Sequence, residues 1–198
     1  MTSIRKNKAT FRNRWSNVSK TNLLDALVSK NSPFGETEEG YVDFRGVCID
    51  QSLHKITISE IDFSFCRVEG GGQFVSHVSN CLFDGGDIDT FLGIHFINCS
   101  FSRANIAEDA MTGKFESCVF DGANFHKRLA SGVHFRECSF IRTDIRKANF
   151  YDCIFERCKL LNCKLGHGSL GGSSFIDCTI EGLDFSTTVM ERVKGLDQ

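Results

Sequence analysis

The residues of this sequence that are best suited to chemistry are its ten cysteines and six histidines. Cysteine thiolates bind zinc, and structural zinc sites usually hold cysteine pairs with two to four residues between them. The densest group is Cys153, Cys158 and Cys163, in which four residues separate each cysteine from the next. Whether these thiols can meet at a metal or in a disulfide depends on the elements that carry them.

The sequence lacks the motifs that would make these residues catalytic. The histidines at positions 54, 77, 95, 126, 134 and 167 are scattered along the chain. No G-x-S-x-G or H-E-x-x-H motif occurs, and the glycine run at 70–72 lacks the lysine of a phosphate-binding loop. We therefore expect a protein that is not an enzyme and that uses no cofactor or metal.

A repeat of five residues positions these side chains, and this period fits neither a helix nor a flat strand. In the C-terminal half every fifth residue, here called a centre residue, is large and apolar except Ala130. An earlier series begins near Tyr41 and slips near 89–95 and 107–114, where we expect short loops to bulge. The regular series is Phe115, Phe120, Phe125, Ala130, Phe135, Phe140, Ile145, Phe150, Phe155, Leu160, Leu165, Leu170, Phe175, Ile180 and Phe185.

The residue two places before each centre residue is usually small, which gives a small-polar-large-polar-polar pattern. This pattern resembles the pentapeptide repeat family, whose motif is A(D/N)LXX. Ala123-Asn124-Phe125 and Ala148-Asn149-Phe150 match it closely. The resemblance covers about residues 41–188. It implies an all-β fold, a right-handed quadrilateral β-helix solenoid in which four pentapeptides form one square coil.

A period of twenty supports the implied coil, because like residues recur at that spacing. Adjacent coils are expected to lie ~4.8 Å apart, as strands in a sheet do. Cysteines five apart then lie on different walls, and stacked cysteines point in parallel directions that suit disulfides poorly. We expect them to be small buried thiols that fill inner corners. The two columns are Phe115, Phe135, Phe155, Phe175 and Cys118, Cys138, Cys158, Cys178.

The chain divides into three parts. Residues 1–40 are a basic N-terminal arm with a short amphipathic helix between Ser19 and Lys30, followed by a linker. Residues 41–188 are the β-helix, and residues 189–198 are a tail whose apolar stripe is expected to cap the last coil or to pair two molecules. Because an open β-helix end exposes an unpaired strand edge, the arm is expected to fold back over the first coils.

Charge is distributed unevenly along the chain. Residues 1–30 carry a net charge of +6, residues 31–113 carry −9, and residues 115–185 are balanced. Three outward columns alternate in sign and are expected to pair between coils. They are Glu116, Arg136, Glu156; Glu137, Arg157, Asp177; and Asp144, Lys164, Asp184.

Two charged surfaces remain as candidate partner-binding sites, with a simply solvated face as the alternative. The acidic surface holds Asp84, Asp87 and Asp89, and Glu108 and Asp109 extend it. The basic ridge is formed by the stacked residues Lys127, Lys147 and His167, flanked by His126, Arg128, Arg142 and Arg146.

These features favour a non-catalytic protein-binding module or scaffold, because a rigid rod presents flat charged faces. The resemblance implies an alternative, since well-known family members protect type II topoisomerases from poisons, including quinolones, as acidic mimics of DNA. This chain would then modulate DNA gyrase or topoisomerase IV, although its basic ridge departs from such mimicry. Direct nucleic-acid binding is a weaker hypothesis, since only Trp15 and Tyr151 are expected to offer stacking platforms.

The remaining expectations concern location and assembly. No run of eighteen apolar residues predicts a membrane span, and the basic start lacks the apolar segment of a secretory signal. Ten cysteines without an export signal favour the reducing cytoplasm. Family resemblance and the apolar tail together suggest a homodimer formed through the C-terminal tail.

Overall fold

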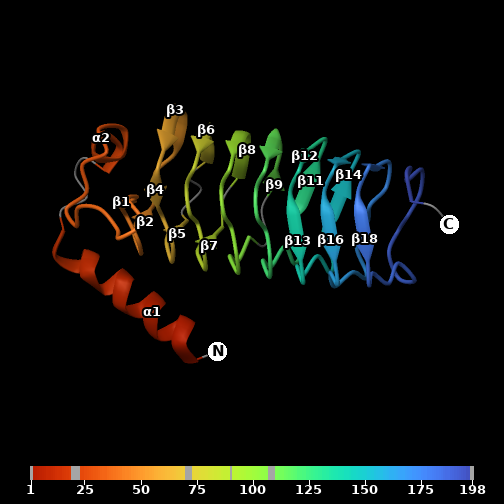
Figure 1. Ribbon diagram of the computed structural model, residues 1–198, viewed down its shortest axis with the longest axis horizontal. Coiled ribbons are helices and arrows are strands. Elements are labelled where there is room, and N and C mark those ends of the chain that lie inside the picture. The colour runs from red at the N-terminus through yellow and green to blue at the C-terminus, as the bar shows by residue number, and fades with distance from the viewer. Residues whose placement is uncertain (1, 19–22, 70–72, 90, 107–109, 197–198) are drawn as a thin grey trace.

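The chain forms a four-sided rod of stacked parallel strands in the computed structural model, with its helices at the N-terminal end (Figure 1). The structure describes residues 2–18, 23–69, 73–89, 91–106 and 110–196. Helix α1 spans Thr2–Asn13, a 3-10 turn spans Arg14–Asn17, and α2 spans Leu23–Val28. Within these ranges no helix has the length and apolar character needed to cross a membrane.

Most strands have two or three residues because each wall of a coil holds only one pentapeptide, and β3, β6 and β8, with seven residues each, are the exceptions among the described strands. They are β1 Val42–Asp43, β2 Cys48–Ile49, β3 Leu53–Ser59, β4 Ile61–Asp62, β5 Arg67–Val68, β6 Gln73–Ser79, β7 Asp87–Ile88, β8 Phe91–Ile97, β9 Ala110–Met111, β10 Lys114–Glu116, β11 Leu129–Ser131, β12 His134–Arg136, β13 Ser139–Ile141, β14 Asn149–Tyr151, β15 Ile154–Glu156, β16 Lys159–Leu161, β17 Ser174–Ile176 and β18 Thr179–Glu181.

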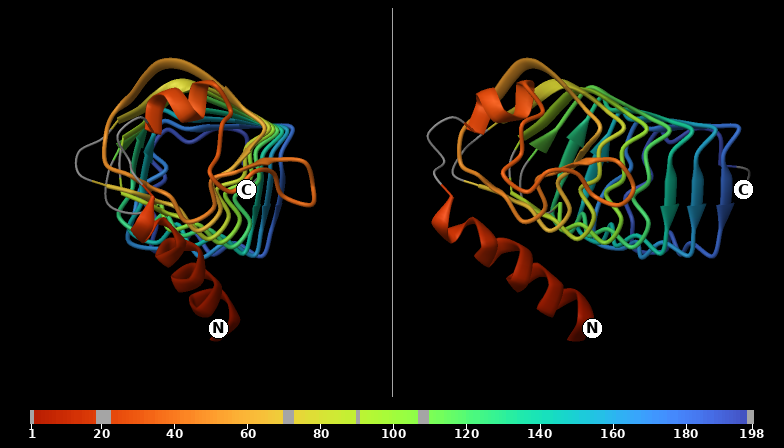
Figure 2. Two further views of the ribbon diagram at one scale, coloured as in Figure 1. Left: turned by 90° about the vertical axis from the view of Figure 1, so that its left-hand side faces the viewer. Right: turned by 60° about the vertical axis from the view of Figure 1, so that its left-hand side comes forward.

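The period of twenty is the register of the coils. Strands β10, β12, β15 and β17 pair in parallel, so that Phe115, Phe135, Phe155 and Phe175 lie in one column. An end-on view shows the four walls around a common axis (Figure 2). The predicted all-β solenoid is therefore confirmed.

Stacked aromatic rings fill the rod. Phe120 is fully buried between Phe101 and Phe140, with ring centroids 5.1 and 5.0 Å away. Phe135 stacks on Phe155 at 5.0 Å and meets Phe140 edge-on at 5.2 Å. Such pairs contribute about 0.5–1.5 kcal/mol each beyond the burial of their surface. The large centre residues of the repeat are thus the core of the fold.

Corners of the coil occur two places after most centre residues, where the backbone takes a positive φ. Lys127, Lys147 and His167 have φ values of 61°, 60° and 56°, and all three side chains are exposed. Because the corner residue projects from the rod, its type sets the charge along each edge. The edge formed by these three residues is basic.

The two predicted slips shorten coils instead of adding loops. Val78 pairs with Phe96, eighteen residues later, and Phe96 pairs with Phe115, nineteen residues later. At the first slip, the seven-residue strands β6 and β8 pair continuously, and Ile94 within β8 keeps the positive φ of a corner residue, at 79°. The prediction of bulging loops is wrong at β8, whereas residues 70–72, 90 and 107–109 lie outside the described part of the chain.

The N-terminal arm folds back over the open end, as expected. The Trp15 ring packs 5.8 Å from that of Phe44, and its indole N–H donates to the Arg45 carbonyl at 2.9 Å. Leu23 and Leu27 of α2 are also buried. Trp15 is therefore a cap on the aromatic core, and its prediction as an exposed stacking platform is wrong. Residues 19–22, at the start of the predicted helix, lie outside the described residues.

The C-terminal tail continues the coil. Ser169 forms a parallel bridge with Val189, and Ser174 forms one with Lys194. Met190 and Val193 are partly buried against the core. The apolar residues of the tail thus extend the repeat by part of a further coil.

Candidate functional site

One wall of the rod contains members of both predicted charged surfaces. Parallel bridges connect Asp87 to Asn105, Asn105 to Asn124, Asn124 to Asp144 and Asp144 to Lys164. This wall, called the ridge wall below, therefore runs from the acidic N-terminal coils to the corners that carry the basic ridge. Between them Asn124 donates a side-chain hydrogen bond to Asn105 at 2.7 Å.

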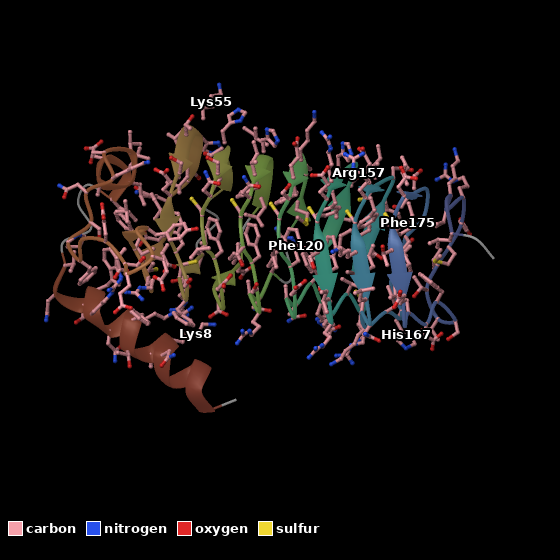
Figure 3. The ribbon with its side chains drawn as sticks, in the orientation of Figure 1. Lys8, Lys55, Phe120, Arg157, His167 and Phe175 are labelled. Carbon is pink, nitrogen blue, oxygen red and sulfur yellow. The ribbon has the colours of Figure 1, made fainter. Side chains whose placement is uncertain are left out.

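Helix α1 covers the acidic end of the ridge wall. Lys8 Nζ lies 2.6 Å from Asp87 Oδ1, and Arg12 Nη2 lies 2.8 Å from Asp87 Oδ2. Burial alone would raise the pKa of Asp87, but hydrogen bonds from Lys8 and Arg12 hold it below its ordinary value. Figure 3 shows Lys8 between α1 and the rod. Asp87, a candidate partner-binding residue, is therefore already paired within the chain.

Close packing reinforces these ion pairs. Arg12 also donates to the backbone carbonyls of Phe65 and Cys66, at 2.9 and 2.7 Å. The Phe11 ring stacks on the Phe65 ring at 5.5 Å. Gly46 makes the approach possible, since a Cβ at this positive-φ position would lie 2.4 Å from the Phe11 carbonyl carbon.

A second ion cluster anchors the turn that follows α1. The Asp43 side chain is only 4% exposed and lies within 3.0 Å of both Arg14 Nη1 and Arg45 Nε. Burial would raise the pKa of Asp43, but hydrogen bonds from Arg14 and Arg45 overcome that effect and hold it well below its ordinary value. The Arg14 guanidinium also lies 3.8 Å above the centre of the Phe34 ring.

The other residues of the predicted acidic surface have different surroundings from those of Asp87. Asp84 accepts hydrogen bonds from the Ser100 hydroxyl and from the Ser102 N–H at 3.0 Å, so this carboxylate supports the next coil. Burial raises the pKa of Asp84. Asp89 is exposed. Glu108 and Asp109 lie outside the described residues.

The basic end of the ridge wall is exposed. The N–H of Lys147 donates to the Gly166 carbonyl at 2.8 Å, which places Lys127, Lys147 and His167 in successive coils along one edge. Arg142 lies at the neighbouring corner with φ 56°. All four side chains are exposed, and Figure 3 shows His167 at the lower edge of the rod.

Two of the residues predicted to flank the ridge have environments that differ from those of the exposed corner residues. Arg146 is exposed but forms an ion pair with Asp144, with Nη2 2.6 Å from Oδ2. Arg128 is fully buried and donates to the Ala110 carbonyl at 2.8 Å, so its predicted place on the ridge is wrong. Residue 128 stands two places before Ala130, in the inward column, and the small alanine leaves room for its long side chain.

The alternating charge columns pair between coils in part. Arg157 Nη2 lies 3.0 Å from Glu137 Oε1, and Arg136 Nε lies 4.0 Å from Glu156 Oε1. In the third column the carboxylate of Asp144 pairs with Arg146 of its own coil, as described above. Histidines join the network, since His95 and His134 approach Glu116 and Glu156 at 2.9 and 3.0 Å.

The cysteines are free thiols, and most are buried. Each thiol of the stacked column reaches a carbonyl of the preceding coil, as Cys138 does with Phe115 at 3.2 Å and Cys158 with Phe135 at 3.3 Å. Burial raises the pKa of Cys66 and Cys153 to about 12, which makes the reactive thiolate rare. Among the described residues no three His, Cys, Asp or Glu side chains form a group that suits a metal ion.

Comparisons with known proteins agree with this architecture. Residues 118–157 match the family model of pentapeptide repeats, with eight copies. The chain therefore contains pentapeptide repeats, and the resemblance drawn from its sequence is confirmed. No curated protein sequence matches the chain.

Solved structures of pentapeptide repeat proteins are similar at low sequence identity. Rfr23 from the cyanobacterium Cyanothece 51142 is 10% identical over 50% of this chain and 86% of its own, with a TM-score of 0.42. A trypsin-treated variant of QnrB1, a plasmid-mediated fluoroquinolone resistance protein, is 17% identical over 74% of this chain and 78% of its own, with a TM-score of 0.47. HetL from the cyanobacterium Nostoc, involved in heterocyst differentiation regulation, is 13% identical over 73% and 87%, with a TM-score of 0.21.

Proposed function

We propose that the chain is a non-catalytic protein-binding scaffold whose basic ridge receives an acidic surface of a partner protein. One observation carries this proposal: the two ends of the ridge wall differ in what covers them. At the acidic end Asp87 is already bound by Lys8 and Arg12 of the same chain. At the other end Lys127, Arg142 and Lys147 are exposed.

Stacked like charges support a binding role for the ridge. Lys127 and Lys147 occupy the same corner one coil apart, about 4.8 Å in the direction of the rod axis. Like charges at this spacing oppose folding slightly, whereas an acidic partner would be attracted by both. The corner backbone is held by the ladder, so the spacing of these charges is fixed before a partner binds.

Polyglutamate tests the proposal. We expect the full chain to bind labelled polyglutamate in an anisotropy titration with an affinity that falls as salt rises. The triple variant Lys127→Glu, Arg142→Glu, Lys147→Glu should lose binding. The matched control Lys114→Glu, Lys159→Glu, Lys194→Glu makes the same charge change elsewhere and should keep most of it. Equal loss in both triple variants would contradict a role for the ridge.

Modulation of DNA gyrase or topoisomerase IV by DNA mimicry is the weaker proposal for this chain. A mimic needs exposed carboxylates, and here Asp43 and Asp87 are paired with arginine or lysine. A supercoiling assay with and without a quinolone tests it directly. Inhibition or drug protection that is lost in Asp89→Lys would favour mimicry over the scaffold role.

A second copy of the chain is a further candidate partner. The C-terminal end holds a hollow of about 340 Å³ whose lining includes the apolar residues Ile180, Leu183 and Phe185. We propose that two molecules meet there, since an open coil edge favours pairing with another chain. Sedimentation should give a dimer that Phe185→Glu dissociates, and a monomer at all concentrations would contradict it.

A further inference from the structure

A trough interrupts the wall beside the basic ridge near the C-terminal end. It has a volume of about 550 Å³, is open to solvent, and has the small residues Ser169 and Gly171 in its lining. Tyr151 lies on the preceding coil, and Val189 and Glu191 lie on the following coil. Because Ser169 and Gly171 of the intervening coil are small, the trough is one coil wide.

The fold does not require this trough. Gly168 must be glycine, since a Cβ there would lie 2.1 Å from the Ala148 carbonyl oxygen. Gly171 is different: its φ is not left-handed, and a Cβ would meet Ser169 Oγ at 3.2 Å, with the Glu191 carbonyl oxygen and Tyr151 Cδ1 both in ordinary contact at 3.7 Å. Ser131 and Tyr151 hold the equivalent position in the two preceding coils. A larger residue at 171 would therefore fit the backbone.

Exposed apolar side chains lie in the trough and near it: Tyr151 and Val189 line it, whereas Leu129 lies outside its lining. Leu129, Tyr151 and Val189 are 45%, 40% and 50% exposed. Leu129 and Val189 belong to one outward column, in which Asn149 and Ser169 stand between them. An aromatic ring, aliphatic side chains and a polar rim around a hollow are the composition of a protein-interaction hot spot.

The trough is continuous with the basic ridge. His167 lines the trough and is also the last stacked residue of the ridge, after Lys127 and Lys147. At the far side Glu191 and Arg192 offset each other in charge. A partner that lies across both features would thus meet positive charge on one side and an apolar hollow on the other.

We propose that the trough receives one aromatic side chain of a partner protein, whose flanking acidic residues lie on the basic ridge. This inference rests on the proposed function and names the chemistry of the partner. The ring would lie against Tyr151, with Val189 on the opposite side. An open hollow favours a side chain presented by a covering protein, because a free small molecule would leave most of its surface in water.

An anchor comparison tests the proposal on the full chain. The probes are an acidic peptide with one central phenylalanine and the same peptide with alanine. We expect the phenylalanine peptide to bind about tenfold more tightly, since a filled hot-spot pocket commonly contributes that much. Gly171→Leu, which fills the trough without changing charge, should remove this advantage. Ser131→Leu, in the same column but outside the trough, should preserve it.

The outcomes distinguish failure of the trough from failure of the scaffold role. Loss of the phenylalanine advantage in Gly171→Leu alone supports the trough. Equal binding of both peptides, with ridge variants still defective, overturns the trough and leaves the scaffold role intact. An advantage that survives in Gly171→Leu also overturns it, because the ring then binds elsewhere. Absence of binding by either peptide contradicts the ridge and the trough together.

Discussion

The two ends of the ridge wall are built on the same repeat but are completed differently. Helices α1 and α2 lie at the N-terminal end of the rod (Figure 1). There Asp87 is bound by Lys8 and Arg12 of α1, and Trp15 closes the aromatic core. At the C-terminal end the corners Lys127 and Lys147 are exposed, and a trough lies beside them. The carboxylate of Asp87 is thus paired within the molecule, whereas the corners Lys127 and Lys147 are exposed to solvent.

This comparison shows how a repeat fold separates stability from recognition. Inward residues such as Phe120 recur at each wall of the coil and form one continuous core. Outward residues are not constrained by that core, and their charge changes from one end to the other. Surface differences are therefore the features of this molecule that carry information about partners.

The largest effect is expected from a substitution in the aromatic core of the rod. Phe120→Ala should lower the free energy of unfolding by about 3–5 kcal/mol, because it leaves a cavity within two stacked pairs. Urea denaturation followed by circular dichroism measures the loss. Ile176→Ala, at a side chain that is 46% exposed, is the control and should change little. Similar stability of the two variants would mean that the aromatic column is not the core.

A smaller effect should be confined to the N-terminal end. Asp43→Asn removes the carboxylate that Arg14 and Arg45 share. We expect a loss of about 2–3 kcal/mol, below the ~3–5 kcal/mol of a fully buried pair because both arginines are partly exposed. Trp15 is the only tryptophan, so its emission should shift to the red as the arm loosens. An unchanged emission maximum would show that the arm is held without this cluster.

Acid should release the arm before it unfolds the rod. The pKa values of Asp43 and Asp87 are lowered in the folded protein, so their contribution is present above the ordinary aspartate pKa of about 4 and is lost as pH falls through the lowered values. Trp15 emission should therefore change below about pH 4 while circular dichroism persists. Asp87→Asn should weaken this pH dependence. Simultaneous loss of both signals would mean that the arm and coils unfold as one unit.

The smallest effect concerns the exposed pairs between coils. Arg157→Ala breaks the contacts with Glu137 and Glu156, but Arg157 and Glu137 are exposed and Glu156 is half-buried. We expect no measurable change in the melting temperature, because exposed ion pairs are screened by water and salt. A clear destabilisation that disappears at high salt would show that the alternating columns stabilise the rod.

The sequence was sufficient to predict the solenoid, its register and its buried thiols. A period of five in centre residues such as Phe115, with Phe135 twenty residues later, specifies which residues stack. The sequence also shows why the prediction that Arg128 lies on the ridge was wrong, because Arg128 occupies the inward position two places before Ala130. The position of Arg128 within the pentapeptide, taken before its charge, predicts that this side chain lies inside the rod.

Other features depend on contacts between distant segments. The docking of Lys8 on Asp87 joins residues seventy-nine positions apart, and the repeat says nothing about where a non-repeating arm lies. The excess of basic residues in the arm and of acidic residues in the early coils was the available signal. The trough could not be predicted, because it arises from small side chains at Ser169 and Gly171 between two larger neighbours.

The central claim is that α1 occupies the acidic end of the ridge wall and leaves the basic end open to a partner. The most direct measurement is amide chemical-shift mapping of the full chain during titration with polyglutamate, with Trp15 emission recorded in parallel. We predict shifts around Lys127, Arg142 and Lys147 with unchanged Trp15 emission. Shifts centred on Lys8 and Arg12, together with a red shift of Trp15, would contradict the account.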